Sequence, residues 1–311
     1  MGNSWRTGRE FPPPRLVARL RAWPFLLQLV LLIALYFVTA KLGLLLAFVQ
    51  TNASPVWLSA GLAIAVLIVF GPRLALGVGL GAFLVNATTG IPLWSAVAMG
   101  LGNALEAYVA YVLLKLFRFR PGLESHRDFL LLTGVAALTA TVSATAGVGS
   151  LALAHNLGNE LIALVWLIWW GGNVLGVITV TPVILTLAFP ISPPSPNWRR
   201  RFEAAVLAVL LAATASVVFL TPYTSAMIVL AVVACLPFML WAALRFGVRG
   251  AAAAVLGWGV LGVWGTAHGT GPFAWLSQSQ ASRSINLQSF IAVISISTLT
   301  LATVLSSRRQ V

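Results

Sequence analysis

Most of the chain consists of long apolar runs separated by short polar, proline-rich or glycine-rich stretches. A helix that crosses a bilayer needs about 20 mostly apolar residues. On that criterion the pattern predicts helical segments at residues 24–48, 56–71, 74–88, 92–116, 128–153, 161–186, 203–220, 225–244, 250–268 and 285–306. The predicted fold is therefore all-α, a polytopic membrane protein with about ten transmembrane helices.

The breaks between these segments differ in clarity. The second and third segments are short and only residues 71–73 separate them, so they are two tilted spans or one re-entrant pair. Proline and glycine end the helices more clearly at 121–122, 190–196 and 221–222. None of the loops is long enough for a folded soluble domain.

The composition favours lipid as the solvent. Apolar residues make up 59% of the chain and charged residues 8%, with a mean hydropathy of +0.96, whereas a soluble domain carries about a quarter charged residues. The net charge is +13. Because the basic residues lie between apolar runs rather than in one patch, they indicate membrane topology and no nucleic-acid partner.

The positions of lysine and arginine predict the orientation. If the N-terminus is cytoplasmic and all ten segments cross, 17 of the 19 Lys and Arg residues fall on the cytoplasmic side. Only Arg283 is then outside, and Lys41 lies within the first span. We therefore expect a multi-pass protein with both termini in the cytoplasm and with residues 1–22 as a basic cytoplasmic tail.

Several kinds of chemistry have no support in the sequence. Cys235 is the single cysteine, and His126, His155 and His268 lie far apart without a metal-binding spacing. We find no phosphate-binding loop, nucleophile elbow, kinase or cyclase motif, or pair of carboxylates at catalytic spacing. The sequence therefore predicts no catalytic residue, no metal, no cofactor and no enzymatic activity.

Polar residues inside apolar segments are the informative ones, because lipid penalises them. Glu106 is the only carboxylate deep in a predicted span, and Asn103 lies one turn before it on the same face. A buried acid must be protonated, hydrogen-bonded or ion-paired, so Glu106 marks a ligand site or a clamp between helices. Lys41 is the expected partner, although a direct pair needs a tilted helix or a water.

Two further groups flank turns. At the outer end of the first helix, Asn52, Ser54 and Trp57 surround a proline, and they form a capped interfacial turn or face a cavity. Asn86 ends a helix whose small residues allow close packing. A packing role is favoured for Asn86, as it is for the hydroxyl-rich stretch 143–149, whose side chains bond to their own helix.

An aromatic run precedes a polar amide in the sixth segment. Trp166, Trp169 and Trp170 share one helical face, and the glycines that follow allow a neighbouring helix to come close. Asn173 places an amide among them. The run is a packing seam, or an aromatic wall beside a buried amide that suits a small ligand.

Taken together and in this order, these stretches resemble the type-one membrane-associated sensor (MASE-type) domain, the bacterial input module that precedes histidine kinases and diguanylate cyclases. The matching stretches are AKLGLLLAFVQTNASPVWLSAG (40–61), GAFLVNATTGIPLWSAVAMGLGNALEAYVAYVLL (81–114), SATAGVGSLAL (143–153) and WLIWWGGNVLGVITVTPVIL (166–185). The resemblance covers most of 25–306. In the family pattern a proline usually follows the tryptophan where Leu58 stands here, and an acid stands at the position of Asn173.

The resemblance implies a multi-pass sensory input domain of the bacterial inner membrane over residues 23–306, followed by the start of a cytoplasmic linker at 307–311 with the output domain absent. Its partners would be the bilayer, a small ligand of unknown identity or a partner membrane protein, and a kinase or cyclase output, fused or separate, with a possible homodimer. The candidate ligand-binding residues are Asn52, Ser54, Trp57, Asn86, Asn103, Glu106, Trp169, Trp170 and Asn173. The alternatives are a small-molecule transporter or its substrate-binding subunit, and a scaffold that docks another membrane protein.

Overall fold

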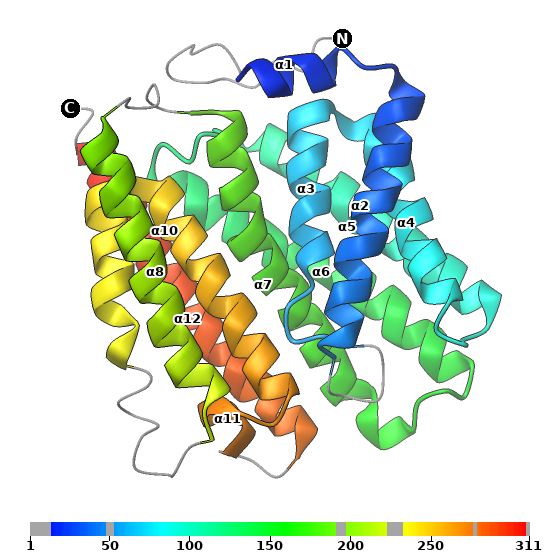
Figure 1. The fold of residues 1–311 in the computed structure, drawn as a ribbon. Helices are drawn as coiled ribbons and strands as arrows, with labels where there is room; N and C mark the ends of the chain where they lie inside the picture. The colour runs from blue at the N-terminus through cyan, green and yellow to red at the C-terminus, as the bar shows by residue number, and fades with distance from the viewer. Residues whose placement is uncertain (1–13, 48–52, 191–196, 223–232, 276–278, 309–311) are drawn as a thin grey trace.

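The computed structural model describes residues 14–47, 53–190, 197–222, 233–275 and 279–308, and this part of the chain is built from helices and turns (Figure 1). The elements are α1 (Arg15–Arg21), α2 (Phe25–Leu45), α3 (Leu58–Phe70), η1 (Pro72–Leu74), α4 (Ala75–Ala87), α5 (Leu93–Leu116), α6 (His126–Leu153), η2 (Asn159–Leu161), α7 (Ile162–Ala188), α8 (Trp198–Leu220), α10 (Leu236–Ala267), α11 (Gly271–Trp275) and α12 (Gln280–Arg308). The all-α prediction is confirmed for these residues.

Local sequence explains where several helices begin. Pro24 and Pro92 stand just before α2 and α5, where a missing backbone N–H costs least. At the start of α6, Ser125 and Asp128 form a capping box: the Ser125 hydroxyl accepts from the Asp128 amide, and the Asp128 carboxylate accepts from the Ser125 amide at 3.2 Å. Two of the unpaired amides at this helix end are satisfied in this way.

Seven helices within the described ranges are long and apolar enough to cross a membrane, namely α2, α5, α6, the η2–α7 unit, α8, the α10–α11 unit and α12. The predicted segments 56–71 and 74–88 become α3 and η1–α4, which are shorter than that criterion. Ten crossings therefore stay a prediction. The number of membrane-length helices also differs from the predicted ten because two predicted segments, 250–268 and the described part of 225–244, fall on α10.

Gly247 divides α10 into two arms. Its backbone is non-helical, with φ 63° and ψ −153°, a combination that is essentially restricted to glycine. Both arms extend away from the end of the bundle where α1 lies (Figure 1). The described part of the predicted segment 225–244 forms the first arm and the segment 250–268 forms the second, so the predicted break between them lies at Gly247.

Arginines tie helix ends together at that end of the bundle. The Arg21 guanidinium donates to the Val69 carbonyl at the end of α3 and lies over the Phe189 ring after α7. Arg249 donates to the Thr186 carbonyl near the end of α7. These cations satisfy terminal carbonyls and favour the negative end of the helix dipole. The C-terminal end of α12 also lies at this end (Figure 1), which the positive-inside rule predicts to face the cytoplasm.

The interior is built around α3 and α7. Most residues of α3 are buried, whereas α2 and α8 expose many large apolar side chains on the outside of the bundle, where lipid is the solvent. Gly61 of α3 and Gly176 of α7 face each other so closely that a Cβ atom at Gly61 would overlap the Gly176 carbonyl. Small residues thus bring the two central helices together.

The Gly247 turn gives a stability prediction. Gly247→Ala should lower the free energy of unfolding by about 1–3 kcal/mol, because an L residue is strained at this φ and ψ. Gly257→Ala in the second arm is the matched control, since a Cβ there would meet only Leu211, at 3.9 Å. Thermal unfolding in detergent measures both variants. Equal melting temperatures for the two variants would contradict the role given to Gly247.

Candidate functional site

A buried carboxyl and a buried amide meet between α5 and α7. Asn173 Nδ2 donates to Glu106 Oε2 at 2.7 Å and to the Ser143 hydroxyl of α6 at 2.6 Å. All three side chains are buried, with Glu106 only 2% exposed. Two residues predicted from separate motifs are therefore brought into direct contact. Ser143, expected to bond within its own helix, instead accepts from the amide of another helix.

A second set of polar groups lies one helical turn away on α5. The Tyr36 hydroxyl of α2 donates to Asn103 Oδ1 at 3.1 Å, and the Trp57 indole donates to the Tyr36 oxygen at 3.4 Å. Asn103 Nδ2 donates to the Met99 carbonyl in its own helix. With Glu106, Asn173 and Ser143, these side chains form what we call the polar cluster. It joins α2, the start of α3, α5, α6 and α7.

The segment 53–57 reaches the polar cluster because it crosses α7 at glycines. The Trp57 amide donates to the Gly172 carbonyl at 2.8 Å. A Cβ atom at Gly172 would overlap the Ser54 carbonyl, and one at Gly176 would overlap the Trp57 carbonyl. The glycines that follow the tryptophans on α7 are therefore needed for this close approach, which places the Trp57 indole beside Tyr36.

The prediction that Lys41 is the partner of Glu106 is wrong. The Lys41 ammonium donates to the Thr88 hydroxyl at the end of α4, and in the described ranges the ion pairs are Arg120–Glu124 and Arg245–Glu203. Glu106 takes an amide as its partner because α6 packs against both α5 and α7, so that Asn173 of α7 reaches Glu106 beside Ser143 of α6. Lys41 lies near the far end of α2. The Oε1 atom of Glu106 is buried and has no hydrogen-bond partner in the described structure.

The other predicted site residues lie outside the polar cluster or outside the described residues. The Ser54 hydroxyl donates to the Val56 carbonyl at 3.2 Å, which fits the capped turn, and Asn86 donates to Ala82 in its own helix. Asn52 is outside the described residues.

The tryptophans of α7 pack on α6. The rings of Trp166 and Trp170 stack at 6.4 Å between centroids, and their ring nitrogens donate to the Thr145 hydroxyl and the Ala137 carbonyl. Trp169 lies against Gly147, where a Cβ atom would come within 2.7 Å of the ring. This arrangement supports the packing-seam interpretation for the stacked pair.

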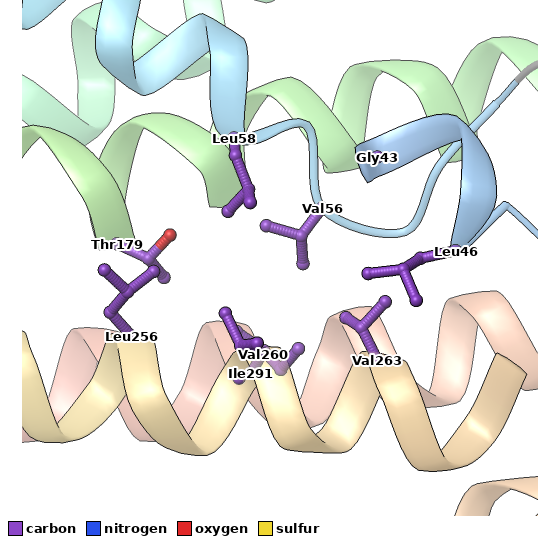
Figure 2. A pocket seen from close by; sticks show the side chains of 10 residues that line it. Gly43, Leu46, Val56, Leu58, Thr179, Leu256, Val260, Val263 and Ile291 are labelled. Carbon is purple, nitrogen blue, oxygen red and sulfur yellow. The ribbon is translucent and has the colours of Figure 1, made fainter. Parts of the chain in front are cut away.

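An apolar cleft lies beside the segment 53–57 (Figure 2). Its cavity volume is about 20 Å³, and it is lined by Gly43, Leu46, Val56, Leu58, Thr179, Leu256, Gly259, Val260, Val263 and Ile291. The Thr179 hydroxyl, the polar side-chain group in this lining, donates to the Leu175 carbonyl of its own helix at 2.6 Å. The cleft therefore offers dispersion contacts alone.

Tyr36 and Gln288 contribute contacts that the sequence analysis did not anticipate. Tyr36 lies in an apolar helix where an aromatic residue is unremarkable. Gln288 of α12 donates to the carbonyls of Pro55 and Ile168. Its signal was available, because an amide in an apolar segment is costly unless it is bonded.

A bundle of apolar helices closed around a polar cluster defines the class of the molecule, a polytopic helical membrane protein. The chain belongs to the MASE1 family, whose family model matches residues 28–309. MASE1 is a membrane-associated sensory domain that is not catalytic in itself, so the resemblance drawn from the sequence is confirmed. No curated protein and no solved structure matches the chain.

Because Glu106 and Asn173 are in direct contact, we expect the effects of substitutions at these two positions on stability to depend on each other. In Asn173→Asp a second carboxyl replaces the amide, and two carboxylates about 3 Å apart cannot both ionise. The variant should be less stable than the parent, and increasingly so as pH rises, because the shared proton is then lost. Thermal unfolding between pH 5 and pH 9 measures this change.

The exchanged pair is the control for that prediction. Glu106→Gln combined with Asn173→Asp again places one amide against one carboxyl, so it should recover stability relative to Asn173→Asp alone. The double-mutant cycle isolates the pairwise interaction. Simple additivity of the two single changes would show that the side chains do not interact.

Proposed function

We propose that this MASE1 domain binds a small ligand at the polar cluster and transmits a change in helix packing to a cytoplasmic signalling output. The observation that carries the proposal is the Oε1 atom of Glu106, which is buried and has no hydrogen-bond donor in the described part of the chain. An unsatisfied buried polar atom costs about 1–3 kcal/mol. A ligand group that donates a hydrogen bond to this oxygen would recover that free energy. The ligand should therefore carry a hydroxyl, an ammonium or a similar hydrogen-bond donor.

The surroundings of Glu106 fit this role. The Asn173 amide donates to the other carboxyl oxygen and to the Ser143 hydroxyl. One carboxyl oxygen is therefore hydrogen-bonded, and the other has no hydrogen-bond partner among the described residues. A ligand that competes for the Asn173 amide, or that donates to Oε1, would change contacts shared by α5, α6 and α7. Binding that differs in strength between two packings of these helices shifts their populations.

The output follows from the family and from the position of the last helix. MASE-type domains precede histidine kinases and diguanylate cyclases, and we propose such an output for this chain, fused to it or separate. The C-terminal part of α12 lies at the same end of the bundle as α1 (Figure 1). We propose that this end faces the cytoplasm and that the bundle spans a bacterial inner membrane. A displacement of α12 would therefore reach the output directly.

Glu106→Gln tests the proposal, because it keeps the shape of the side chain and removes the carboxylate. We expect the activity of a kinase or cyclase fused after residue 311 to change at least about fivefold, the lower range of coupling between sites. Thr139→Val is the matched control, since Thr139 is buried on α6 and its hydroxyl bonds to Val135 of the same helix. The readout is phosphorylation or cyclic dinucleotide produced by membranes that carry equal amounts of each variant.

Other functions predict other results. A transporter would accumulate its substrate in vesicles, and Glu106→Gln would abolish the accumulation. A domain that only docks a partner membrane protein would keep its output unchanged in Glu106→Gln. That second result, with Thr139→Val also unchanged, would exclude the polar cluster as the sensing site.

A further inference from the structure

Gln288 links the last helix to the segment 53–57. Its amide donates to the Pro55 carbonyl at 3.1 Å and to the Ile168 carbonyl of α7 at 2.8 Å. The side chain is buried, at 8% exposure. One side chain of α12 therefore holds two elements that lie 233 and 120 residues away in the sequence.

The fit around Gln288 is close. A Cβ atom at Gly171 of α7 would come within 2.9 to 3.2 Å of the end of the Gln288 side chain. Glycine at this position therefore leaves the room that the amide occupies. Since an amide buried in an apolar bundle is costly without partners, the two hydrogen bonds hold Gln288 in this position.

Other polar side chains on α12 bond differently. The hydroxyls of Ser284, Ser295 and Thr303 donate to carbonyls of α12 itself. Such bonds satisfy a polar group without connecting elements. Gln288 is thus distinguished by bonds that leave its own helix and end on the segment beside the polar cluster.

Apolar contacts also lie near this link. Ile291, about one turn further along α12, lines the apolar cleft together with Val56 and Leu58 (Figure 2). Val56 and Ile291 are both buried in the same hydrophobic core. Apolar packing is not directional, so the hydrogen bond from Gln288 to Pro55 is the contact that specifies where the segment 53–57 lies along α12.

We propose that Gln288 is a positioning residue that fixes the segment 53–57 on α7 and couples the position of this segment to α12. Pro55 lies two residues before Trp57, whose indole donates to Tyr36 in the polar cluster. A rearrangement of the cluster would therefore reach α12 through Trp57, Pro55 and Gln288. The signalling part of this inference rests on the proposed function, whereas the positioning part does not.

The test measures how well the segment is held. Ala53, which is buried, is replaced by cysteine in a Cys235→Ala background, and its reaction rate with a small maleimide is followed in lipid nanodiscs of the full chain. Gln288→Met keeps the length of the side chain and removes both donors. We expect the rate to rise about fivefold, because modification proceeds through the opened segment and the lost hydrogen bond to Pro55 contributes a net of about 1 kcal/mol.

Two comparisons make the result specific. Ser295→Ala removes a polar group that bonds only within α12, and it should leave the rate unchanged. Gly171→Ala pushes on the Gln288 amide from α7 and should raise the rate even if Gln288→Met does not fold. The inference is overturned if neither Gln288→Met nor Gly171→Ala raises the rate, or if Ser295→Ala raises it as much.

A second readout separates this inference from the proposed function. In the fused output, Gln288→Met should uncouple Glu106, so that adding Glu106→Gln changes the activity less than twofold. The maleimide rate needs neither ligand nor output. If Glu106→Gln leaves the output activity of the parent unchanged, the proposed function fails. The maleimide reaction rate still tests whether Gln288 positions the segment. A full effect of Glu106→Gln in the Gln288→Met background would overturn the coupling.

Discussion

Every polar group that this protein places inside its bundle must find a partner inside the bundle, because lipid offers none. The hydrogen bond between Asn173 and Glu106 meets this requirement where it is most demanding. The bond needs α5, α6 and α7 at one depth, and Tyr36 and Trp57 extend it to α2 and α3. Three buried side-chain atoms in the described ranges have no hydrogen-bond partner, namely Glu106 Oε1, Trp258 Nε1 and Thr300 Oγ1. Of these, Glu106 Oε1 belongs to the polar cluster, and this is why we place ligand recognition there.

Close approach of the backbone is the second condition for the polar cluster. The segment 53–57 carries Trp57 into the cluster only because glycines at 172 and 176 let it lie directly on α7. A side chain at either position would push the segment away and break the bond from Trp57 to Tyr36. Packing by small residues and hydrogen bonding between helices therefore act together, as is common in membrane bundles.

The predictions from sequence were most accurate where they depended on one segment at a time. Hydropathy located the helices and proline and glycine located most of their ends, because these signals are local. Glu106 and Asn173 were singled out as polar residues in apolar segments, but Lys41 was the wrong partner. A partner depends on which helices pack and at which depth, and hydropathy reports only the solvent of a segment. Gln288 was missed although the sequence marks it in the same way, as an amide in an apolar segment; only its partners depend on the packing.

The sequence by itself determined that the chain is a helical membrane protein, that arginines lie between its apolar segments, and that a few polar residues must be protected from lipid. Only the tertiary structure decided how these residues combine: Asn173 against Glu106, Tyr36 between Asn103 and Trp57, and Gln288 across to Pro55. The physical reason is that burial cost belongs to each residue and can be read from its type. The hydrogen bond that removes the cost belongs to a pair, and pairs are set by the packing of helices distant in the sequence.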